Sequence, residues 1–335
     1  MGEGGAPFMV GLLGAFCLSA VSVAGMRRAL TTAGAIDQPG ERRSHSVPTP
    51  RGGGVGIVAG WTLVLVLLVA DPSESGWVAL LAAVLAIAAL GFRDDLRDVP
   101  AVLRVALQAA VSLAFLLALW PVPITLGGWD FPVAWPWLGV FTLVFVAGIN
   151  FYNFLDGING IAALQAMFGG VLLGAVGLAG GDGALALACF GLAAAAAGFV
   201  PWNFPHARVF MGDVGSTAIG LGFCALGVIG AERGTWQLLT PALAMSLFVV
   251  DALLTVLGRM ARGARWYTAH REHAYQKLTI SGWSHTAVTL TYGALNVAVV
   301  APVVWLTRDS GPIQLLAGIA LWGFLAILWL AARRS

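Results

Sequence analysis

The sequence predicts an all-α, polytopic integral membrane protein with about eleven transmembrane helices, an outside N-terminus and a cytoplasmic C-terminus. Three observations predict it: the composition, a series of long apolar stretches, and the concentration of basic residues between alternate stretches. Of the 335 residues, 59% are hydrophobic and only 10% are charged. That balance excludes an ordinary soluble domain.

Eleven stretches are apolar enough to be spanning helices. Several are shorter than the roughly 20 residues that cross a bilayer, so their ends are approximate. The first lacks a basic region before it and is followed by Arg27 and Arg28, which indicates an anchor and not a cleaved signal peptide. The stretches lie near residues 7–25, 53–70, 77–92, 101–120, 137–152, 159–179, 184–200, 215–231, 236–258, 286–307 and 313–331.

The basic residues orient the chain. With alternate loops assigned to one side, 16 of the 18 Lys and Arg residues fall there, and only Arg233 and Arg308 lie opposite. The positive-inside rule makes the richer side the cytoplasm. We therefore expect one domain, residues 1–335, in the inner (plasma) membrane, with its active site on the cytoplasmic face. The active-site loops are expected near 26–52, 93–100, 150–160, 201–216 and 259–285.

Other features of the composition carry less information. A net charge of +2 gives no argument for nucleic acid. Cys17, Cys189 and Cys224 lie in apolar segments without zinc or disulfide spacing, which is typical of small core residues. The outside loop 121–136 contains four prolines and two glycines that exclude a helix.

The first cytoplasmic loop contains candidate anion-binding groups. Prolines and glycines keep it irregular, and Arg42, Arg43, His45 and Arg51 would attract anions. The glycines at 52–54 precede the next helix, so their N–H groups could approach a phosphate. A positive-inside loop whose glycines serve only helix packing is the alternative.

The second cluster is acidic and consists of Asp94, Asp95 and Asp98. Residues three and four apart meet on one helix face, so these carboxylates repel one another unless a cation lies between them. The cluster suggests an enzyme that handles a metal and an anionic substrate at a membrane surface. A solvated loop in which the acids pair with Arg93 and Arg97 is the alternative.

The third cluster lies at the end of the span near 137–152. Asn150, Asn153 and Asp156 recur every three residues and form one polar stripe, which is costly to bury without partners. Asp156 and Gly157 then end the helix where a ligand could reach the backbone. Simple helix capping is the alternative.

The fourth cluster places Asp213 at the start of a span, flanked by Gly212 and Gly215. A helix N-cap would account for Asp213 and Ser216. Oxygen ligands at a glycine-flanked turn would equally suit a hard divalent cation.

The fifth cluster contains His270 and His273, which would share one helix face at a spacing compatible with zinc. No third nitrogen or sulfur ligand lies nearby in the sequence, so phosphate recognition is favoured over zinc. Asp251 stands inside a predicted span, which indicates either a functional group or a partner for a nearby base such as Arg259.

Together these clusters resemble the motifs of the polyprenyl-phosphate N-acetylhexosamine-1-phosphate transferases, a family that includes phospho-N-acetylmuramoyl-pentapeptide transferase. The resemblance runs from Asp37 to about Lys277, with the motifs in the family's order. Three segments are specific in combination: the acidic run at Asp94, Asn-Phe-Leu-Asp-Gly at 153–157 and Phe-Met-Gly-Asp-Val-Gly-Ser at 210–216. The segment 270–276 is similar to that of bacterial surface-polysaccharide (O-antigen) initiators. Asn159 departs from the aspartate of many members.

The resemblance implies an α-helical enzyme with Mg²⁺ as cofactor, for which Mn²⁺ is a possible substitute. It implies metal ligands at Asp213 and Asn153, and catalytic residues at Asp94, Asp95 and Asp156. The implied partners are a UDP-N-acetylhexosamine, undecaprenyl phosphate and membrane lipid; a homodimer is compatible, and no nucleic acid is expected. The residues implied to bind substrate are Arg51, Asn153, Gly157, Asn203, Phe210, His270, Arg271 and His273.

The implied reaction transfers N-acetylhexosamine 1-phosphate from the UDP-sugar to the lipid phosphate and releases UMP. A phosphate monoester has a second pKa of about 6 and is mostly dianionic at neutral pH. Because the attacking oxygen of the lipid phosphate is then already deprotonated, a general base is less necessary. We therefore expect Asp94 and Asp95 to act mainly through the metal and by positioning the lipid phosphate. UDP-N-acetylglucosamine or a 6-deoxy relative is the favoured donor.

Two alternatives remain at this stage. A transporter would also account for eleven spans and for Asp251 inside one of them. However, it would place polar groups at mid-membrane, whereas here they gather at one surface. A lipid phosphotransferase with a different nucleotide donor, such as a CDP-alcohol transferase, would carry a longer run of aspartates interleaved with glycine and alanine.

Overall fold

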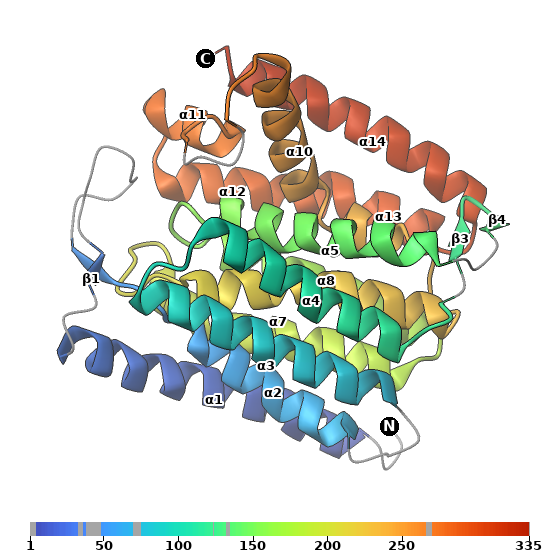
Figure 1. Cartoon of the computed structure of the whole chain (residues 1–335), viewed down its shortest axis with the longest axis horizontal. Coiled ribbons are helices and arrows are strands. Elements are labelled where there is room, and N and C mark those ends of the chain that lie inside the picture. The colour runs from blue at the N-terminus through green and yellow to red at the C-terminus, as the bar shows by residue number, and fades with distance from the viewer. Residues whose placement is uncertain are drawn as a thin grey trace.

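The computed structural model describes residues 5–32, 36–37, 48–69, 75–122, 124–131, 135–265 and 270–334, and most of them are helical. Nine of the described helices are long and apolar enough to cross a membrane, which confirms the predicted all-α polytopic class. Most of them lie side by side as one bundle, whereas α10 is steeply inclined to its neighbours (Figure 1). The helices are α1 (Gly5–Thr32), α2 (Val55–Val69), α3 (Ser75–Leu96), α4 (Ala101–Ala118), α5 (Pro136–Leu155), α6 (Ile161–Ala179), α7 (Gly183–Asn203), α8 (Asp213–Glu232), α9 (Thr240–Ala244), α10 (Ser246–Ala261), α11 (Ala274–Ile280), α12 (His285–Leu295), the π-helix η1 (Asn296–Val300), α13 (Ala301–Thr307) and α14 (Gly311–Ala332).

Each of the eleven predicted stretches coincides with helix, but two of them are not regular. The stretch predicted near 236–258 is divided at Met245 into α9 and α10, and the one near 286–307 contains η1 between α12 and α13. Gln165 of α6 serves both irregular points: its Nε2 donates to the Ala244 carbonyl at 3.2 Å, and its Oε1 accepts from Asn296 Nδ2 at 2.7 Å. A buried amide thus satisfies a carbonyl that the interrupted helix leaves unpaired.

Two short antiparallel hairpins complete the described chain. Strands β1 (Ile36–Asp37) and β2 (Thr49–Pro50) pair with Ile36 opposite Pro50, at the end of the bundle where α11 lies (Figure 1). Strands β3 (Ile124–Leu126) and β4 (Trp129–Phe131) pair at the opposite end, within the loop that was predicted only to be non-helical.

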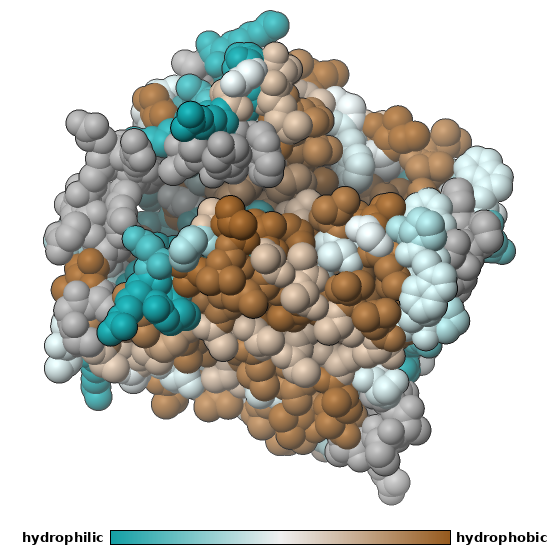
Figure 2. All heavy atoms as spheres, viewed as in Figure 1, coloured by the Kyte–Doolittle hydropathy of each residue, from teal (hydrophilic) through white to brown (hydrophobic). Residues whose placement is uncertain are grey.

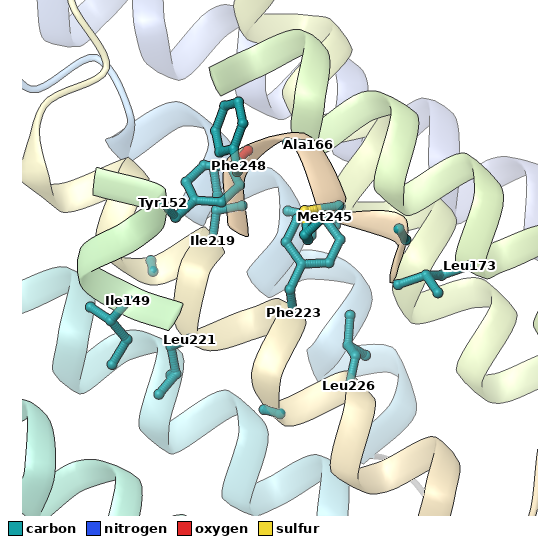
Figure 3. Packing of buried hydrophobic residues seen from close by; sticks show 14 of the residues in the cluster. Ile149, Tyr152, Ala166, Leu173, Ile219, Leu221, Phe223, Leu226, Met245 and Phe248 are labelled. Carbon is teal, nitrogen blue, oxygen red and sulfur yellow. The ribbon is translucent and has the colours of Figure 1, made fainter. Parts of the chain in front are cut away.

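Helix α8 is the centre of the bundle, because 17 of its 20 residues are buried. Its N-terminal part packs on α3, α5 and α2. Aromatic rings fill the space beside it: Tyr152 lies 6.0 Å from Phe223 and 5.1 Å from Phe248 between ring centroids, with Met245 next to Phe223 (Figure 3). This packing joins the middle of α8 to α5, and α5 to α10.

The outer surface separates into an apolar band and polar ends. In the view of Figure 2, hydrophobic side chains cover the middle of the bundle, and the strongly hydrophilic ones gather towards the end where α11 lies. Large apolar side chains stay exposed on the outer helices, as expected of surfaces that face lipid.

Candidate active site

The site is built around the first turn of α8, where several chain segments meet at one end of the bundle. Helices α3 and α5 end there, α4 begins there, and residues 48–54 run alongside 208–212. Arg51 forms a parallel β-bridge with Phe210, and the Phe210 N–H donates to the Pro50 carbonyl at 2.8 Å. Residues that are far apart in the sequence are thereby fixed beside Asp213.

Asp95 caps α8 from the neighbouring helix α3. Its Oδ1 accepts the Asp213 N–H at 2.8 Å and its Oδ2 accepts the Val214 N–H at 3.0 Å. Arg51 Nε lies 2.9 Å from the same Oδ1, and the Asp95 side chain has no exposed surface. Two otherwise unpaired N–H groups of a helix start are thus satisfied by a carboxylate, which the helix dipole also favours.

A glycine is required where this cap meets the chain. Gly212 has φ 75°, and a Cβ there would lie 2.5 Å from Asp95 Oδ2. Any larger residue would therefore be strained in its backbone and would displace the capping carboxylate.

Asp213 is the most highly connected carboxylate of the site. It accepts hydrogen bonds from Arg51 Nη2 and from Asn153 Nδ2, the latter at 3.1 Å. Arg104 Nη1 lies 3.4 Å from Asp213 Oδ2 and 2.5 Å from Asp94 Oδ2. Arg104 therefore links the two carboxylates, and Asp94 is further held by the Val99 N–H at 2.6 Å.

The predicted polar stripe of α5 has partners on two neighbouring helices. Asn150 Nδ2 donates to Gln108 of α4 at 2.7 Å, and Asn153 Nδ2 also donates to Ser216 of α8 at 2.8 Å. Among the described residues no hydrogen bond occupies the amide oxygen of Asn153. The stripe therefore joins helices, which simple capping would not require.

Asp156 ends the stripe and differs from the other carboxylates, because no described residue forms a hydrogen bond with its side chain. Burial raises the pKa of its carboxyl to about 7; Arg51 opposes this increase, and the carboxylates of Asp213 and Asp95 add to it. Burial alone would lower the pKa of Arg51, but Asp213 and Asp95 outweigh that effect and raise it. The neighbouring carboxylates thus contribute to both shifts, although burial is the larger cause for Asp156.

The prediction that Gly52, Gly53 and Gly54 cradle a phosphate is wrong. Their N–H groups donate to the carbonyls of Phe210 and Met211 at 2.8–3.2 Å. A Cβ on Gly54 would lie 2.4 Å from the Cα of Gly215. The glycines are needed for close backbone packing, which was the alternative interpretation. Arg42, Arg43 and His45, predicted to attract anions, lie outside the described residues.

Asn203 is buried, and both its amide oxygen and its amide nitrogen are hydrogen-bonded within the protein. Its Oδ1 accepts the Gly160 N–H at 2.7 Å, and its Nδ2 donates to the Val209 carbonyl at 2.9 Å. It ties the turn after α5 to the strand-like segment that carries Phe210. Nucleotide contacts of Asn203 and Phe210 stay predictions.

The histidine segment approaches the same site through α11. Tyr275 Oη donates to the Phe154 carbonyl at 3.0 Å. A Cβ on Gly157 would lie 2.0 Å from the hydroxyl oxygen of Tyr275. The rings of His270 and His273 lie 5.0 Å apart between centroids, with Arg271 between them in sequence and partly buried. The first turn of α11 thus lies against Gly157, and the ring of His273 lies 6.1 Å from that of Phe154 between centroids.

Zinc gains no support from this segment. Within the described part of the chain, no three His, Cys, Asp or Glu residues are arranged to hold a metal ion on their own. Burial, followed by the nearby His273 and Arg259, lowers the pKa of His270 to about 4. The imidazole of His270 is therefore neutral near pH 7 and can offer a hydrogen bond to an anion, but no charge.

The carboxylate cluster does suit Mg²⁺. If all four were ionised, Asp94, Asp95, Asp156 and Asp213 would carry four negative charges against the two positive charges of Arg51 and Arg104, and a bound cation would favour that ionised state over the protonated one indicated by the raised pKa of Asp156. The available donors are hard oxygen atoms. Mg²⁺ usually keeps several water ligands and takes one or two carboxylates together with substrate phosphates. A site that offers fewer than three protein ligands is compatible with this coordination of Mg²⁺.

Two contributors to the site were not predicted as site residues: Arg104 and Gln108, both on α4. Each is a polar residue inside a predicted apolar span, and such residues mark functional or pairing positions. The rule that singled out Asp251 would have found them.

Comparisons with known proteins find a family profile and several relatives that are similar to this chain. The sequence profile of glycosyl transferase family 4 matches residues 77–231. The decaprenyl-phosphate N-acetylglucosaminephosphotransferase of Mycolicibacterium smegmatis is 30% identical over 335 aligned positions, which cover 86% of this chain and 79% of that protein. The phospho-N-acetylmuramoyl-pentapeptide-transferase of Synechococcus elongatus is 32% identical, covering 76% and 74% respectively. A Bacillus subtilis protein named probable undecaprenyl-phosphate N-acetylglucosaminyl 1-phosphate transferase is 26% identical, covering 83% and 78%.

Proposed function

Because this chain belongs to glycosyl transferase family 4, we propose that it transfers an N-acetylhexosamine 1-phosphate from a UDP-sugar to a polyprenyl phosphate and releases UMP. The product would be the lipid-linked diphosphate sugar that starts a cell-envelope polysaccharide, and the reaction would take place at the cytoplasmic face of the inner membrane. The names of the relatives favour N-acetylglucosamine as the sugar.

One observation carries the proposal: carboxylates and guanidinium groups from α3, α4, α8 and the segment before α2 converge on the first turn of α8. A diphosphate donor and a phosphate acceptor are both anions, so they require cationic side chains and compensation of charge. Arg51 and Arg104 supply the former, and the excess of carboxylates is what a divalent cation would offset.

Asp213 and Asp94 are the residues that would hold Mg²⁺, together with the amide oxygen of Asn153. When bound, the ion would supply positive charge that offsets the donor diphosphate and the charge that develops on the leaving UMP. In the transfer, an oxygen of the lipid phosphate forms a bond to the β-phosphorus, and the bond from that phosphorus to the bridging oxygen of UMP breaks. The buried Asp95 would not touch substrate; it would position Asp213 through the first turn of α8.

The acceptor's prenyl chain has a candidate place in an apolar groove of about 390 Å³ between α5, α8, α9, α10 and α14. Phe151, Tyr152, Phe223, Met245 and Phe248 are among its lining residues. Tyr152 directly precedes Asn153 of the site, so a lipid lying here could bring its phosphate towards Asp213. The groove consists almost entirely of apolar surface, as a hydrocarbon chain requires.

The proposal is tested by measuring UMP release from purified protein with undecaprenyl phosphate, Mg²⁺ and a panel of UDP-N-acetylhexosamines. We expect UMP with one donor, loss of UMP release in chelator and recovery when Mg²⁺ is restored. Asp213→Asn should reduce turnover by on the order of 100-fold or more, as loss of one electrostatic contact to a transition state does. Asp309→Asn, at a carboxylate that is 81% exposed beyond α13, is the matched control and should behave as wild type.

Two results would contradict the proposal. One is a folded, membrane-inserted protein that binds Mg²⁺ but releases no UMP with any donor. The other is equal UMP release by wild type and Asp213→Asn, which would remove Asp213 from the reaction.

A further inference from the structure

Asp251 of α10 is a buried carboxylate that the proposed reaction does not use. It is 3% exposed, so a carboxylate here needs several hydrogen-bond donors. The structure supplies them from three other elements as well as its own helix. The donors are the N–H groups of Ala274 (2.9 Å) and Tyr275 (3.4 Å), the Tyr292 hydroxyl (3.0 Å), the Trp329 indole N–H (3.2 Å) and the Thr255 hydroxyl (3.3 Å).

Two of these donors are the first N–H groups of α11, so Asp251 caps that helix from a neighbouring one. The arrangement repeats that of Asp95, which caps α8 in the same way. His273, at the N-cap of α11, has Nδ1 3.4 Å from Asp251 Oδ1. Nδ1 thus faces Asp251 at ion-pair distance and without a hydrogen bond, and Nε2 is the other polar atom of the ring.

The helix held by Asp251 also touches the turn that carries Asp156. Tyr275 Oη donates to the Phe154 carbonyl at 3.0 Å and packs against Gly157, where even a methyl group would not fit. The first turn of α11 therefore contacts Asp251 through its N–H groups and the 154–157 turn through the side chain of Tyr275. A shift of α11 would move His273 and disturb this turn together.

The segment before α11 is held by a separate group of charges. Glu272 accepts from Arg259, from Arg262 at 2.5 Å and from Arg333, whose Nη2 lies 3.4 Å away. Burial opposes ionisation of Glu272, but Arg259 and Arg262 outweigh it and lower its pKa. This cluster secures the loop on its outer flank, and Asp251 secures it on its buried side.

We propose that Asp251 is a positioning residue, which holds His273 and the first turn of α11 so that the histidine segment and the 153–157 turn face the same bound donor. The inference rests on the proposed function for its kinetic consequence, whereas its structural consequence can be measured without substrate. Asp251 itself makes no contact with the carboxylate cluster.

The first test uses hydrogen exchange of substrate-free protein. Asp251→Asn keeps the size of the side chain but points an NH₂ group at N–H donors. We expect faster exchange of the Ala274 and Tyr275 amides, by roughly 10-fold or more, since loss of about 1.4 kcal/mol of local stability corresponds to that factor. Asp251→Glu, which keeps the carboxylate, should restore part of the protection. Unchanged protection in Asp251→Asn would overturn the proposal, and this test does not depend on the reaction.

The second test separates KM from kcat. If the histidine segment binds the donor equally in ground and transition states, Asp251→Asn raises KM for the UDP-sugar on the order of 10-fold and leaves kcat within about 3-fold. Tyr275→Phe cuts the link to Phe154 without touching Asp251 and should raise KM in the same direction, which keeps the test valid if Asp251→Asn does not fold. A wild-type KM in both variants would overturn the proposal.

Asp182→Asn is the matched control. Asp182 is also a capping carboxylate, since it accepts the Leu185 N–H at 3.0 Å and pairs with Arg233, but it lies at the opposite end of the bundle. Its loss should lower thermal stability and leave KM unchanged. A rise in KM for this variant as large as that for Asp251→Asn would show a general effect of destabilisation and would also overturn the proposal.

Discussion

At the scale of single residues, adjacent aspartates of α3 have different surroundings and should fail differently when replaced. Asp95 has no exposed side-chain surface and accepts two N–H groups of α8, whereas Asp94 faces Arg104 and is 9% exposed. Asp95→Asn leaves a buried donor opposite a helix N–H, which costs about 1–3 kcal/mol. We expect its thermal midpoint in detergent to fall clearly below that of Asp94→Asn.

Both variants should lose turnover, but for different reasons. Asp94→Asn should stay closer to wild type in stability and lose turnover through the proposed metal site and the ion pair with Arg104. Equal midpoints for the two variants would mean that Asp95 does not support α8, and Asp95 would then have to be considered a group that touches substrate.

His270 provides a prediction on pH dependence. Its pKa in the folded protein is lowered to about 4 by burial, His273 and Arg259, against about 6.5 in the unfolded chain. Between these values the unfolded chain binds the proton and the folded protein does not, so the free energy of unfolding decreases as the pH falls from about 6.5 to about 4. The stability that the lowered pKa of His270 contributes is fully present above about pH 6.5.

His270→Gln removes this titration, so its thermal midpoint should decline less steeply than that of wild type over the same pH interval. Above pH 7 the two slopes should agree. Identical slopes between pH 6.5 and 4 would show that His270 is protonated normally in the folded protein.

Residue patterns in the sequence pointed to acidic and amide side chains that the structure brings together. Asp94, Asp95, Asn153, Asp156 and Asp213 do converge, because each lies at the end of a span on the same side. The sequence patterns did not indicate which groups the glycines at 52–54 and Asn203 would hydrogen-bond. The glycines at 52–54 donate to protein carbonyls and Asn203 is consumed by the backbone, since both depend on how the 48–54 and 203–212 segments lie against each other.

At the scale of elements, the close approach of α2 and α8 depends on glycines at their N-termini. A Cβ on Gly54 would lie 2.4 Å from Gly215 Cα and 2.8 Å from the Met211 carbonyl oxygen. These neighbours are backbone atoms that cannot rotate away. Gly54→Ala should therefore separate α2 from α8, with an overpacking cost of about 1–3 kcal/mol or more and a loss of turnover through displaced Arg51.

Gly139→Ala is the control for this prediction, because a Cβ at that exposed position of α5 would meet nothing within 4 Å. It should leave the thermal midpoint unchanged or slightly raised, as alanine is the better helix former. If Gly54→Ala unfolds at the wild-type temperature, the backbone contact is not as tight as described.

Helical segments were predictable at this scale because a spanning helix must be long and apolar. The interruptions were not predictable. The break at Met245 and the π-helix at 296–300 are stabilised by Gln165, which lies about 80 and 131 positions away in the chain. A local pattern contains no information on which distant amide will satisfy a broken helix.

At the scale of the whole molecule, alternate helix ends separate the charges. The C-terminal ends of α1, α3, α5, α7, α10 and α14 lie at the end that holds the site, together with 14 of the 16 basic residues that the structure describes. Arg233 and Arg308 lie at the other end, where one pairs with Asp182 and the other stacks on Trp305 at 4.2 Å. Such an asymmetry is expected to orient the bundle with its site in the cytoplasm.

This orientation can be measured with reporters fused to the full chain. Green fluorescent protein fused after Ser335 should fluoresce, because it folds in the cytoplasm, and alkaline phosphatase inserted after Asp309 should be active, because it requires the outside. Replacing Arg27, Arg28, Arg333 and Arg334 by glutamine weakens the asymmetry without altering the carboxylate cluster, and should produce a fraction of inverted molecules. A silent reporter after Ser335 together with an inactive one after Asp309 would indicate that the fusions prevented insertion. The opposite result is loss of fluorescence after Ser335, with alkaline phosphatase active there and inactive after Asp309. It would place the site outside, and a donor that exists only in the cytoplasm would then be excluded.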